Sequence, residues 1–346
     1  MKVAILTFSL ANNRGAMMQC YALYSKLEEL GHDPTIVSIA LPSPKHSWRG
    51  KITSVIEKYL FDSFRKKHFR NTTKIYKSAE ELRKDPPVAD AYIVGSDQVW
   101  NSKLISRFGC EAFFLDFALP EKKRIAYAVS LGEDKWENPD KKILDLIKNF
   151  DTISVREDDS VSILKQNLKV DNVKVVLDPV FLFNNYENLL CKDHFNNGNI
   201  LIMSLFKNPL FLEISEEISR RFDCKVEQIG YRKSKKSHII HPFVGVIKWL
   251  KMIYGARIII TNSFHCMAMS IIFGKDFIVV PPYPGREKRM TSMLSKLSLS
   301  NRYVKDLNDF ESRIDELMVS IDYEPVHKKL DQLRIDAVNY LKNALS

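Results

Sequence analysis

The chain has 346 residues, of which 45% are hydrophobic and 27% are charged, and its formal net charge is +10. These proportions are typical of a globular protein and exclude a disordered chain, a collagen and a coiled-coil rod. The length predicts about two domains.

Short β-rich runs alternate with helical runs in the first half of the chain. The residues at the start resemble a short secretory signal, but the amphipathic helix that follows favours a buried first strand. Predicted strands are Lys2–Phe8, Thr35–Ile39, Ala91–Gly95, Arg124–Ser130, Thr152–Val155 and Val173–Leu177, and predicted helices are Ala16–Leu30, Lys141–Asn149 and Asp158–Gln166.

The alternation stops and then restarts in the second half. Six asparagines lie within residues 183–199 and favour turns, so we predict a linker there. Predicted strands are then Ile200–Leu205, Lys225–Ile229, Arg257–Thr261 and Phe277–Val280, and predicted helices are Phe211–Arg221, Val244–Ile253, Phe264–Phe273, Arg286–Leu297 and Val326–Leu345.

This pattern predicts an α/β protein with two parallel-sheet domains, residues 1–182 and 200–323, followed by a C-terminal helix over residues 324–346. Ligands of such sheets bind beyond the carboxyl ends of the strands, so we expect a shared site in an inter-domain cleft.

Cysteine usage and hydropathy indicate the compartment. The five cysteines are scattered, odd in number and never in Cys-x-x-Cys spacing, which favours a reducing compartment over a disulfide framework or a thiolate zinc site. The longest uncharged stretch, residues 258–274, is shorter than the about 20 apolar residues of a membrane span. We expect a cytoplasmic protein, and no cluster has the spacing of metal ligands, so we expect no metal.

Residues 42–77 form a basic segment. They hold ten Lys or Arg residues against Glu57 and Asp62, a net charge of +8, with aromatic residues such as Trp48, Tyr59 and Phe61 interleaved. The commoner explanation of such a run is a solvated helix face. The alternative is docking to an anionic surface, either nucleic acid or the inner face of the cell membrane.

Several standard signatures are missing. The sequence has no G-x-G-x-x-G after its first strand, no G-x-x-x-x-G-K-[ST], no H-E-x-x-H and no G-x-S-x-G. This argues against a typical dinucleotide enzyme, a P-loop enzyme, a zincin and an α/β-hydrolase.

Two loops of the first domain hold candidate binding residues. After the first strand, Asn13 and Gly15 begin a helix whose free N–H groups attract anions, although an ordinary Asn-capped turn has the same pattern. The loop that follows strand Ala91–Gly95 contains Ser96, Asp97, Gln98 and Asn101. Asp97 is a candidate general base or sugar-hydroxyl acceptor, and the alternative is that Ser96 and Asp97 cap the next helix.

Candidate cations lie at further strand ends. Arg156 follows a short strand and could bind a carboxylate or phosphate, or else form a structural ion pair with Glu157 or Asp159. Lys288 and Arg289 begin a later helix and suit an anionic ligand, unless they are simply solvated.

His265 is the candidate for acid–base chemistry. It follows Asn262 and Ser263 at a strand-to-helix turn, in the first turn of a helix that is apolar all round. A lone His is usually structural, but a His beside hydroxyls at the mouth of a buried helix is a better catalytic candidate than most. With Arg156, Arg289 and Lys288 it favours a small, doubly anionic donor and a hydroxyl-rich acceptor.

Five ordered segments resemble the polysaccharide pyruvyl transferase family, and they extend over most of the chain, to about residue 303. They are Asn13-x-Gly15-Ala16-x-x-Gln19-x-Tyr21-Ala22-Leu23, Gly95–Asn101, Ser154–Glu157, Leu177–Pro179 and Thr261–His265. The resemblance implies two Rossmann-like domains in a GT-B-like arrangement. It also implies phosphoenolpyruvate as donor substrate with no cofactor, and a capsule or exopolysaccharide sugar as acceptor, either nucleotide-linked or lipid-linked.

The resemblance also implies roles for individual residues. The family's His falls on His265, as the acid or the phosphate partner, and its Arg falls on Arg156. Ser263 lies where many members carry Arg, so Arg289 or Lys288 would supply that cation. Asp97 would orient a sugar hydroxyl as base, and the substrate-binding residues would be Asn13, Gly15, Ser96, Gln98, Asn101, Asn262, Ser263, Lys288 and Arg289.

Two other functions are compatible with the sequence. The first is a nucleotide-sugar glycosyltransferase of the same architecture. The second is a non-enzymatic binding module that acts through residues 42–77. Among partners of that segment we expect an anionic membrane rather than nucleic acid.

Overall fold

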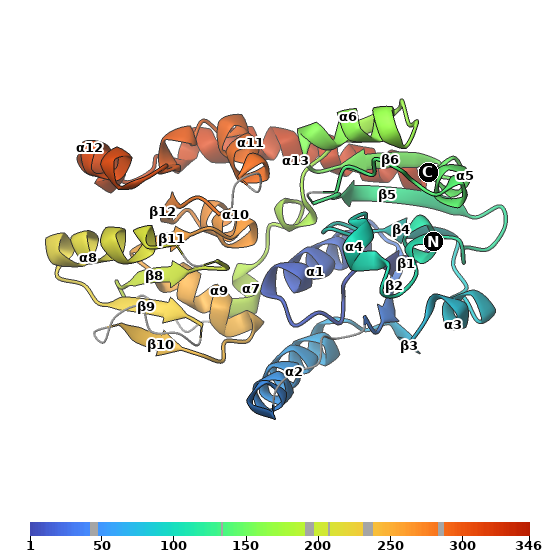
Figure 1. Ribbon diagram of the computed structural model, residues 1–346, viewed down its shortest axis with the longest axis horizontal. Coiled ribbons are helices and arrows are strands. Elements are labelled where there is room, and N and C mark those ends of the chain that lie inside the picture. The colour runs from blue at the N-terminus through green and yellow to red at the C-terminus, as the bar shows by residue number, and fades with distance from the viewer. Residues whose placement is uncertain (42–47, 133, 191–196, 207, 231–237, 283–286) are drawn as a thin grey trace. The chain divides into compact units, whose positions relative to one another are not determined.

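The computed structural model divides the chain into two compact units (Figure 1). It describes residues 1–41, 48–132, 134–190, 197–206, 208–230, 238–282 and 287–346, without the side chains of residues 48–53. The first unit comprises Met1–Ile52, Arg65–Phe183 and Gln332–Ser346, and the second comprises Thr53–Phe64 and Asn184–Asp331. The final helix is thus divided between the units, whereas the sequence analysis set residues 324–346 apart.

The first unit contains a seven-stranded parallel sheet of order β3-β2-β1-β4-β5-β6-β7. Its strands are β1 (Lys2–Leu6), β2 (Asp33–Ile39), β3 (Thr72–Tyr76), β4 (Ala91–Val94), β5 (Lys123–Val129), β6 (Thr152–Val155) and β7 (Val173–Val175). The chain order reverses between β1 and β4. This topological switch point is where ligands of open α/β sheets bind.

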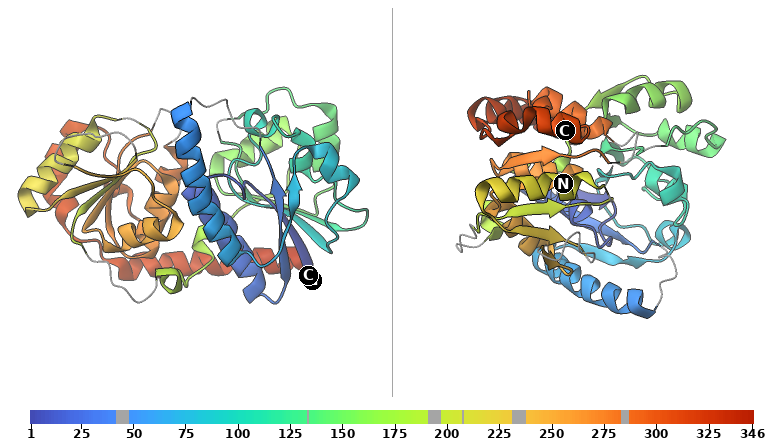
Figure 2. Two further views of the ribbon diagram at one scale, coloured as in Figure 1. Left: turned by 90° about the horizontal axis from the view of Figure 1, so that it is seen from below. Right: turned by 60° about the vertical axis from the view of Figure 1, so that its left-hand side comes forward.

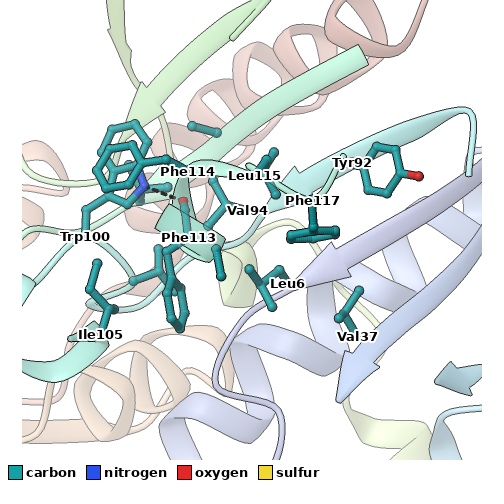
Figure 3. Close-up of a cluster of buried hydrophobic side chains, with 14 of the residues drawn as sticks. Leu6, Val37, Tyr92, Val94, Trp100, Ile105, Phe113, Phe114, Leu115 and Phe117 are labelled. Carbon is teal, nitrogen blue, oxygen red and sulfur yellow. Dashed lines mark hydrogen bonds between the residues drawn. The ribbon is translucent and has the colours of Figure 1, made fainter. Parts of the chain in front are cut away.

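Helices and short 3₁₀ turns connect these strands. They are α1 (Arg14–Glu29), the two ends of α2 (Trp48–His68), α3 (Ala79–Lys84), α4 (Ser102–Ile105), η1 (Cys110–Phe114), α5 (Lys141–Ile147), α6 (Asp158–Asn167), η2 (Pro179–Phe181) and the end of α13 (Tyr323–Leu345). Alternate residues of the inner strands point to one face and pack on aromatic side chains from η1 and its neighbours (Figure 3).

Trp100 lies at the centre of this aromatic core. Its ring is fully buried, stacks on Phe114 with centroids 5.0 Å apart, and donates Nε1–H to the Phe113 carbonyl at 2.9 Å (Figure 3). The indole of Trp136 in turn donates to the carbonyl of Trp100 at 2.6 Å. This packing fixes the segment that directly follows the β4 loop.

The second unit repeats the plan with a five-stranded parallel sheet of order β10-β9-β8-β11-β12. Its strands are β8 (Ile200–Met203), β9 (Val226–Ile229), β10 (Ile239–His241), β11 (Ile258–Thr261) and β12 (Asp276–Val279). Its helices are α7 (Glu187–Leu190), α8 (Leu210–Phe222), α9 (Val246–Gly255), α10 (Phe264–Ile272), α11 (Lys288–Lys296), η3 (Ser300–Arg302) and α12 (Leu307–Met318). Here the chain order reverses between β8 and β11.

Helices cover both faces of the second sheet (Figure 2). Ile200, Ile202 and Ile260 pack on one face against apolar side chains of α8 and α12. The residues between them in sequence point to the other face, the side of α9 and α10. Because both faces are covered, the inner strands β8 and β11 are apolar except for Thr261, as buried parallel strands usually are.

The fold class predicted from the sequence is confirmed, since both sheets are parallel and alternate with helices. Strand Thr152–Val155 has the predicted bounds, and most other predicted elements differ by one to three residues at an end. Strands β3 and β10 and helices α3, α4, α7 and α12 were not predicted from the sequence. Among the described residues, no helix is long and apolar enough to cross a membrane.

Candidate functional site

Three loops singled out by the sequence lie at the topological switch points: those after β1 and β4 in the first unit and the one after β11 in the second. In the first unit the segments after β1 and β4 are joined, because the Thr7 hydroxyl donates to the carbonyl of Ser96 at 2.9 Å. In the second unit the Thr261 hydroxyl donates to the carbonyl of Met203 at 2.8 Å. Each loop therefore begins at a fixed, buried point at the carboxyl edge of its sheet.

The helix start after β1 is already capped. The Asn13 side-chain oxygen accepts from the backbone N–H groups of Gly15 and Ala16 at 2.8 and 3.1 Å. Two of the N–H groups that were expected to attract an anion are thus satisfied within the chain. The contacts of Asn13 and Gly15 correspond to the capped turn that the sequence analysis gave as the alternative.

Arg156 is the centre of a buried charge cluster at the end of β6. Its guanidinium donates to Asp178 at 2.7 Å through Nη1 and to Glu157 at 2.8 Å through Nε, while Asp97 lies 3.7 Å from Nη2. Only 2% of the Arg156 side chain is exposed. Burial alone would lower the pKa of this guanidinium, but the three carboxylates outweigh burial and raise it.

Two serines complete this cluster. Ser96 donates to Asp178 at 3.0 Å, and Ser130 donates to Glu157 at 2.9 Å. The four charged groups carry one positive and three negative charges, a net charge that disfavours a further anion beside them. These contacts favour a positioning role for Arg156, which ties the ends of β4 and β6 to Asp178.

Asp97 occupies an unusual backbone conformation beside an irregular strand. Its φ of 79° lies in the left-handed region, which costs energy for a residue other than glycine. The neighbouring end of β5 has a register shift between Ala126 and Val129, and Ala128 has a φ of 51°. Such irregularities re-aim side chains and are enriched beside active sites. The Asp97 side chain is partly exposed.

Gln98 and Asn101 lie together against the loop after β5. The Asn101 amide donates to the Gln98 side-chain oxygen at 3.3 Å, and both are partly buried. A Cβ added to Gly132, whose φ is +65°, would lie 2.6 Å from Gln98 Oε1. The close approach of Gly132 therefore orders two of the predicted substrate-binding side chains.

In the second unit, Asn262 holds the ends of β8 and β11 together. Its side-chain oxygen accepts from the Leu205 N–H at 2.8 Å, and its amide donates to the Phe206 carbonyl at 3.2 Å. The residue is 2% exposed. Both ends of the amide are thus engaged with backbone, which makes Asn262 a structural part of the loop.

Ser263 and His265 begin the buried helix α10. Ser263 is the N-cap, and its hydroxyl oxygen accepts from the Cys266 N–H at 3.4 Å. His265 follows in the first turn, at the positive end of the helix dipole, and is 8% exposed. Its ring meets the ring of Phe264 edge-on, with centroids 5.3 Å apart.

Arg289 joins this group through the same Phe264 ring. The guanidinium carbon lies 5.6 Å from the ring centroid, in cation–π geometry. Lys288 precedes it and is exposed at the start of α11. The structure therefore brings His265 and Arg289 together around Phe264, and it brings Asp97 and Arg156 together in the other unit.

Two residues that shape these loops were not among the candidates predicted from the sequence. Asp178, which is fully buried on Arg156, was noted only as part of the resemblance. Arg65 belongs to the basic segment but is 8% exposed, and it donates to the carbonyls of Ser9 and Ala11 at 2.8 and 2.9 Å. It anchors the loop after β1. Because Arg65 lies more than 50 residues from Ser9 and Ala11 in sequence, no local sequence pattern links them.

The described residues contain no group of three or more His, Cys, Asp or Glu side chains that could hold a metal ion. The charge cluster includes three carboxylates, but the guanidinium of Arg156 occupies their centre.

Comparison with known proteins gives a family and a fold. The family model for polysaccharide pyruvyl transferase matches residues 13–282. Curated proteins offer no match to this sequence.

Solved structures resemble the chain over nearly its full length. UDP-GlcNAc 2-epimerase from Neisseria meningitidis, bound to UDP-GlcNAc, has a TM-score of 0.57 at 11% identity over 100% of this chain and 99% of that one. The enzyme of the same name from Methanocaldococcus jannaschii, in complex with UDP-GlcNAc and UDP, has a TM-score of 0.53 at 14% identity over 96% of this chain and 99% of that one. An α-glucosyltransferase in complex with UDP has a TM-score of 0.54 at 11% identity over 99% of this chain and 95% of that one. At these identities the likeness establishes the fold alone, which is the GT-B fold implied by the resemblance.

Proposed function

Because the chain belongs to the polysaccharide pyruvyl transferase family, we propose that it transfers a pyruvyl group from phosphoenolpyruvate to two hydroxyls of a sugar in capsule or exopolysaccharide biosynthesis. Membership of the family makes the protein a transferase.

The observation that carries the proposal is that an imidazole and a guanidinium contact the same aromatic ring at the switch point of the second unit. His265 and Arg289 both contact Phe264, at the carboxyl edge where α/β sheets bind ligands. Phosphoenolpyruvate carries a phosphate and a carboxylate. We assign Arg289 to one of these anionic groups, as the cation that compensates for Ser263, with Lys288 beside it.

His265 is then the proton donor. The helix N-terminus and the nearby guanidinium disfavour an imidazolium, whereas a bound phosphate dianion favours it. His265 would therefore hold a proton while the donor is bound and transfer it to the methylene carbon, which becomes a methyl group.

The remaining steps balance without an oxidant or a metal ion. The first sugar hydroxyl attacks the cationic carbon and loses its proton to a base. The bond from that carbon to the phosphate oxygen then breaks, phosphate departs, and the second hydroxyl closes the ketal. The proton of the second hydroxyl leaves with phosphate. The proton that the base took from the first hydroxyl passes to His265, so that the base and the acid both return to their starting forms.

We assign Asp97 as the base that orients the acceptor hydroxyl. It is a partly exposed carboxylate at the switch edge of the first unit, and the carbonyl of its strained backbone accepts from the Ser130 N–H at 3.0 Å. Arg156 holds it in place from the protein interior. Gln98 and Asn101 present amide groups beside it, which suit the hydroxyls of a sugar.

A nucleotide sugar is the competing donor, because the solved structures that share this fold carry UDP or UDP-GlcNAc. The two donors are distinguished by thermal unfolding of the full chain with phosphoenolpyruvate, UDP-GlcNAc or UDP. We expect phosphoenolpyruvate alone to raise the unfolding temperature. A rise in the unfolding temperature with UDP-GlcNAc or UDP, and none with phosphoenolpyruvate, would contradict this proposal and favour a glycosyltransferase.

A matched pair of variants tests the assignment of Arg289. Arg257 makes the same kind of contact in the same unit, with its guanidinium carbon 4.0 Å from the Phe222 ring, but it precedes β11 and lies at the opposite edge of the sheet. We expect Arg289→Gln to weaken phosphoenolpyruvate binding at least tenfold and Arg257→Gln to leave it unchanged. Equal effects of the two substitutions would show that Arg289 does not contact the donor.

A further inference from the structure

Helix α2 presents an exposed face that combines large apolar side chains with lysines. Val55 and Tyr59 are 68% and 74% exposed, and Ile56 is 37% exposed. Lys58, Lys66 and Lys67 are also exposed. Exposed apolar residues usually occur singly on a protein surface, so three within five residues of one helix need an explanation.

The helical periodicity places these residues on one side. Val55 and Tyr59 are four residues apart and Lys66 follows seven residues later, so all three fall on the same face. Phe61 and Phe64 occupy the opposite face and are buried, and Arg65 between the two faces is also buried. The buried face of α2 thus packs the helix on the rest of the protein, and the exposed apolar residues take no part in that packing.

We propose that this face of α2 docks the enzyme on an anionic lipid bilayer. The lysines are complementary to acidic headgroups, and Val55, Ile56 and Tyr59 can enter the interface between headgroups and acyl chains. A nucleic acid would match the lysines, but it would leave the aliphatic side chains without a partner. Arg65 takes no part in the docking, because the loop after β1 engages its guanidinium.

This inference deepens the proposed function, since a membrane-bound enzyme is suited to an acceptor sugar carried on a lipid. It does not require that function to be correct. Docking is measured by vesicle binding alone, without substrate, whereas the proposed function is tested with phosphoenolpyruvate and no vesicles.

The experiment is flotation of the full chain with vesicles of phosphatidylglycerol and phosphatidylcholine, compared with phosphatidylcholine alone. We expect binding to the anionic vesicles only, and weaker binding as salt is raised. Each lysine near an anionic surface changes binding by a factor of about five, so Lys66→Gln with Lys67→Gln should weaken it about 25-fold. The matched control removes two exposed lysines elsewhere, Lys103→Gln with Lys165→Gln, and should change binding little.

A second variant separates insertion from simple charge attraction. Tyr59→Ser with Val55→Ser keeps every charge and changes only exposed side chains, so it should remain folded yet lose most vesicle binding. Equal loss in the Lys66/Lys67 variant and its control would overturn the proposal, as would unchanged binding of the serine variant. Salt-dependent binding to single-stranded DNA without vesicle binding would assign the basic segment to nucleic acid instead.

Discussion

Replacing Arg156 by methionine tests whether this residue holds the first unit together or binds the donor. The substitution keeps an apolar, unbranched side chain but removes the guanidinium of a side chain that is 2% exposed and contacts Asp178, Glu157 and Asp97. Three carboxylates then lose their cation. Ser96 and Ser130, which donate into the same cluster, cannot neutralise them.

The expected cost follows from the burial of these groups. Removing one partner of a buried ion pair typically destabilises a protein by about 3–5 kcal/mol, because a buried charge remains uncompensated. For a unit of this size, 1 kcal/mol corresponds to about 2–4 °C in unfolding temperature. Arg156→Met should therefore lower that temperature by about 6–20 °C. Arg156→Lys keeps the charge and should cost less.

The assay is thermal unfolding of each variant with and without phosphoenolpyruvate. If Arg156 only positions the loops, the Arg156→Met protein unfolds earlier but is still stabilised by the donor. Arg220→Met, which removes an exposed pair with Glu217, should change the unfolding temperature little. A variant with unchanged stability that no longer responds to phosphoenolpyruvate would refute the positioning role and restore direct anion binding.

Three further outcomes follow from buried contacts of the first unit. Trp100→Phe leaves the Phe113 carbonyl without its indole donor and should cost about 1–3 kcal/mol in urea unfolding. Gly132→Ala should destabilise the protein and reduce its affinity for the acceptor in steady-state kinetics, because the added Cβ would lie 2.6 Å from Gln98 Oε1 at a φ of +65°. Burial lowers the pKa of His68 below 6.5, so the unfolded chain binds its proton first and the free energy of unfolding falls as pH drops below about 6.5. His68→Gln should flatten that dependence in urea unfolding at pH 7.5 and 5.5.

The fold could be predicted from sequence wherever burial imposes a pattern. The inner strands β4, β8 and β11 are almost wholly apolar because both faces of their sheets are covered, and each was predicted to within two residues at its ends. Strand β3 was missed because it lies at the edge of its sheet, where only Tyr76 is buried and the rest of the strand shows no apolar run. Strand β10, at the edge of the other sheet, has three residues and no fully buried one.

The candidate site could be predicted in position but not in its contacts. Strand ends are readable from sequence, so Asp97, Arg156 and His265 were placed at the carboxyl edges where the structure has them. The partners of Arg156 were harder to foresee. Glu157 is adjacent in sequence, but Asp178 is 22 residues away and Ser96 is 60 residues away, and no local periodicity links them. The proposed positioning role therefore depends on contacts that only the fold creates.

The two switch points explain why the short segment from Thr261 to His265 indicates both the fold and the chemistry. Where neighbouring strands lead to opposite faces of a sheet, the loops that follow them diverge and leave a crevice in which ligands bind. A buried threonine hydroxyl bridges that gap in each unit, from Thr7 to the Ser96 carbonyl and from Thr261 to the Met203 carbonyl. The side chains that follow are held at the open edge of the sheet. In the segment from Thr261 to His265, the first residue thus secures the strand ends, while His265, four residues later, is the one that we assign to the reaction.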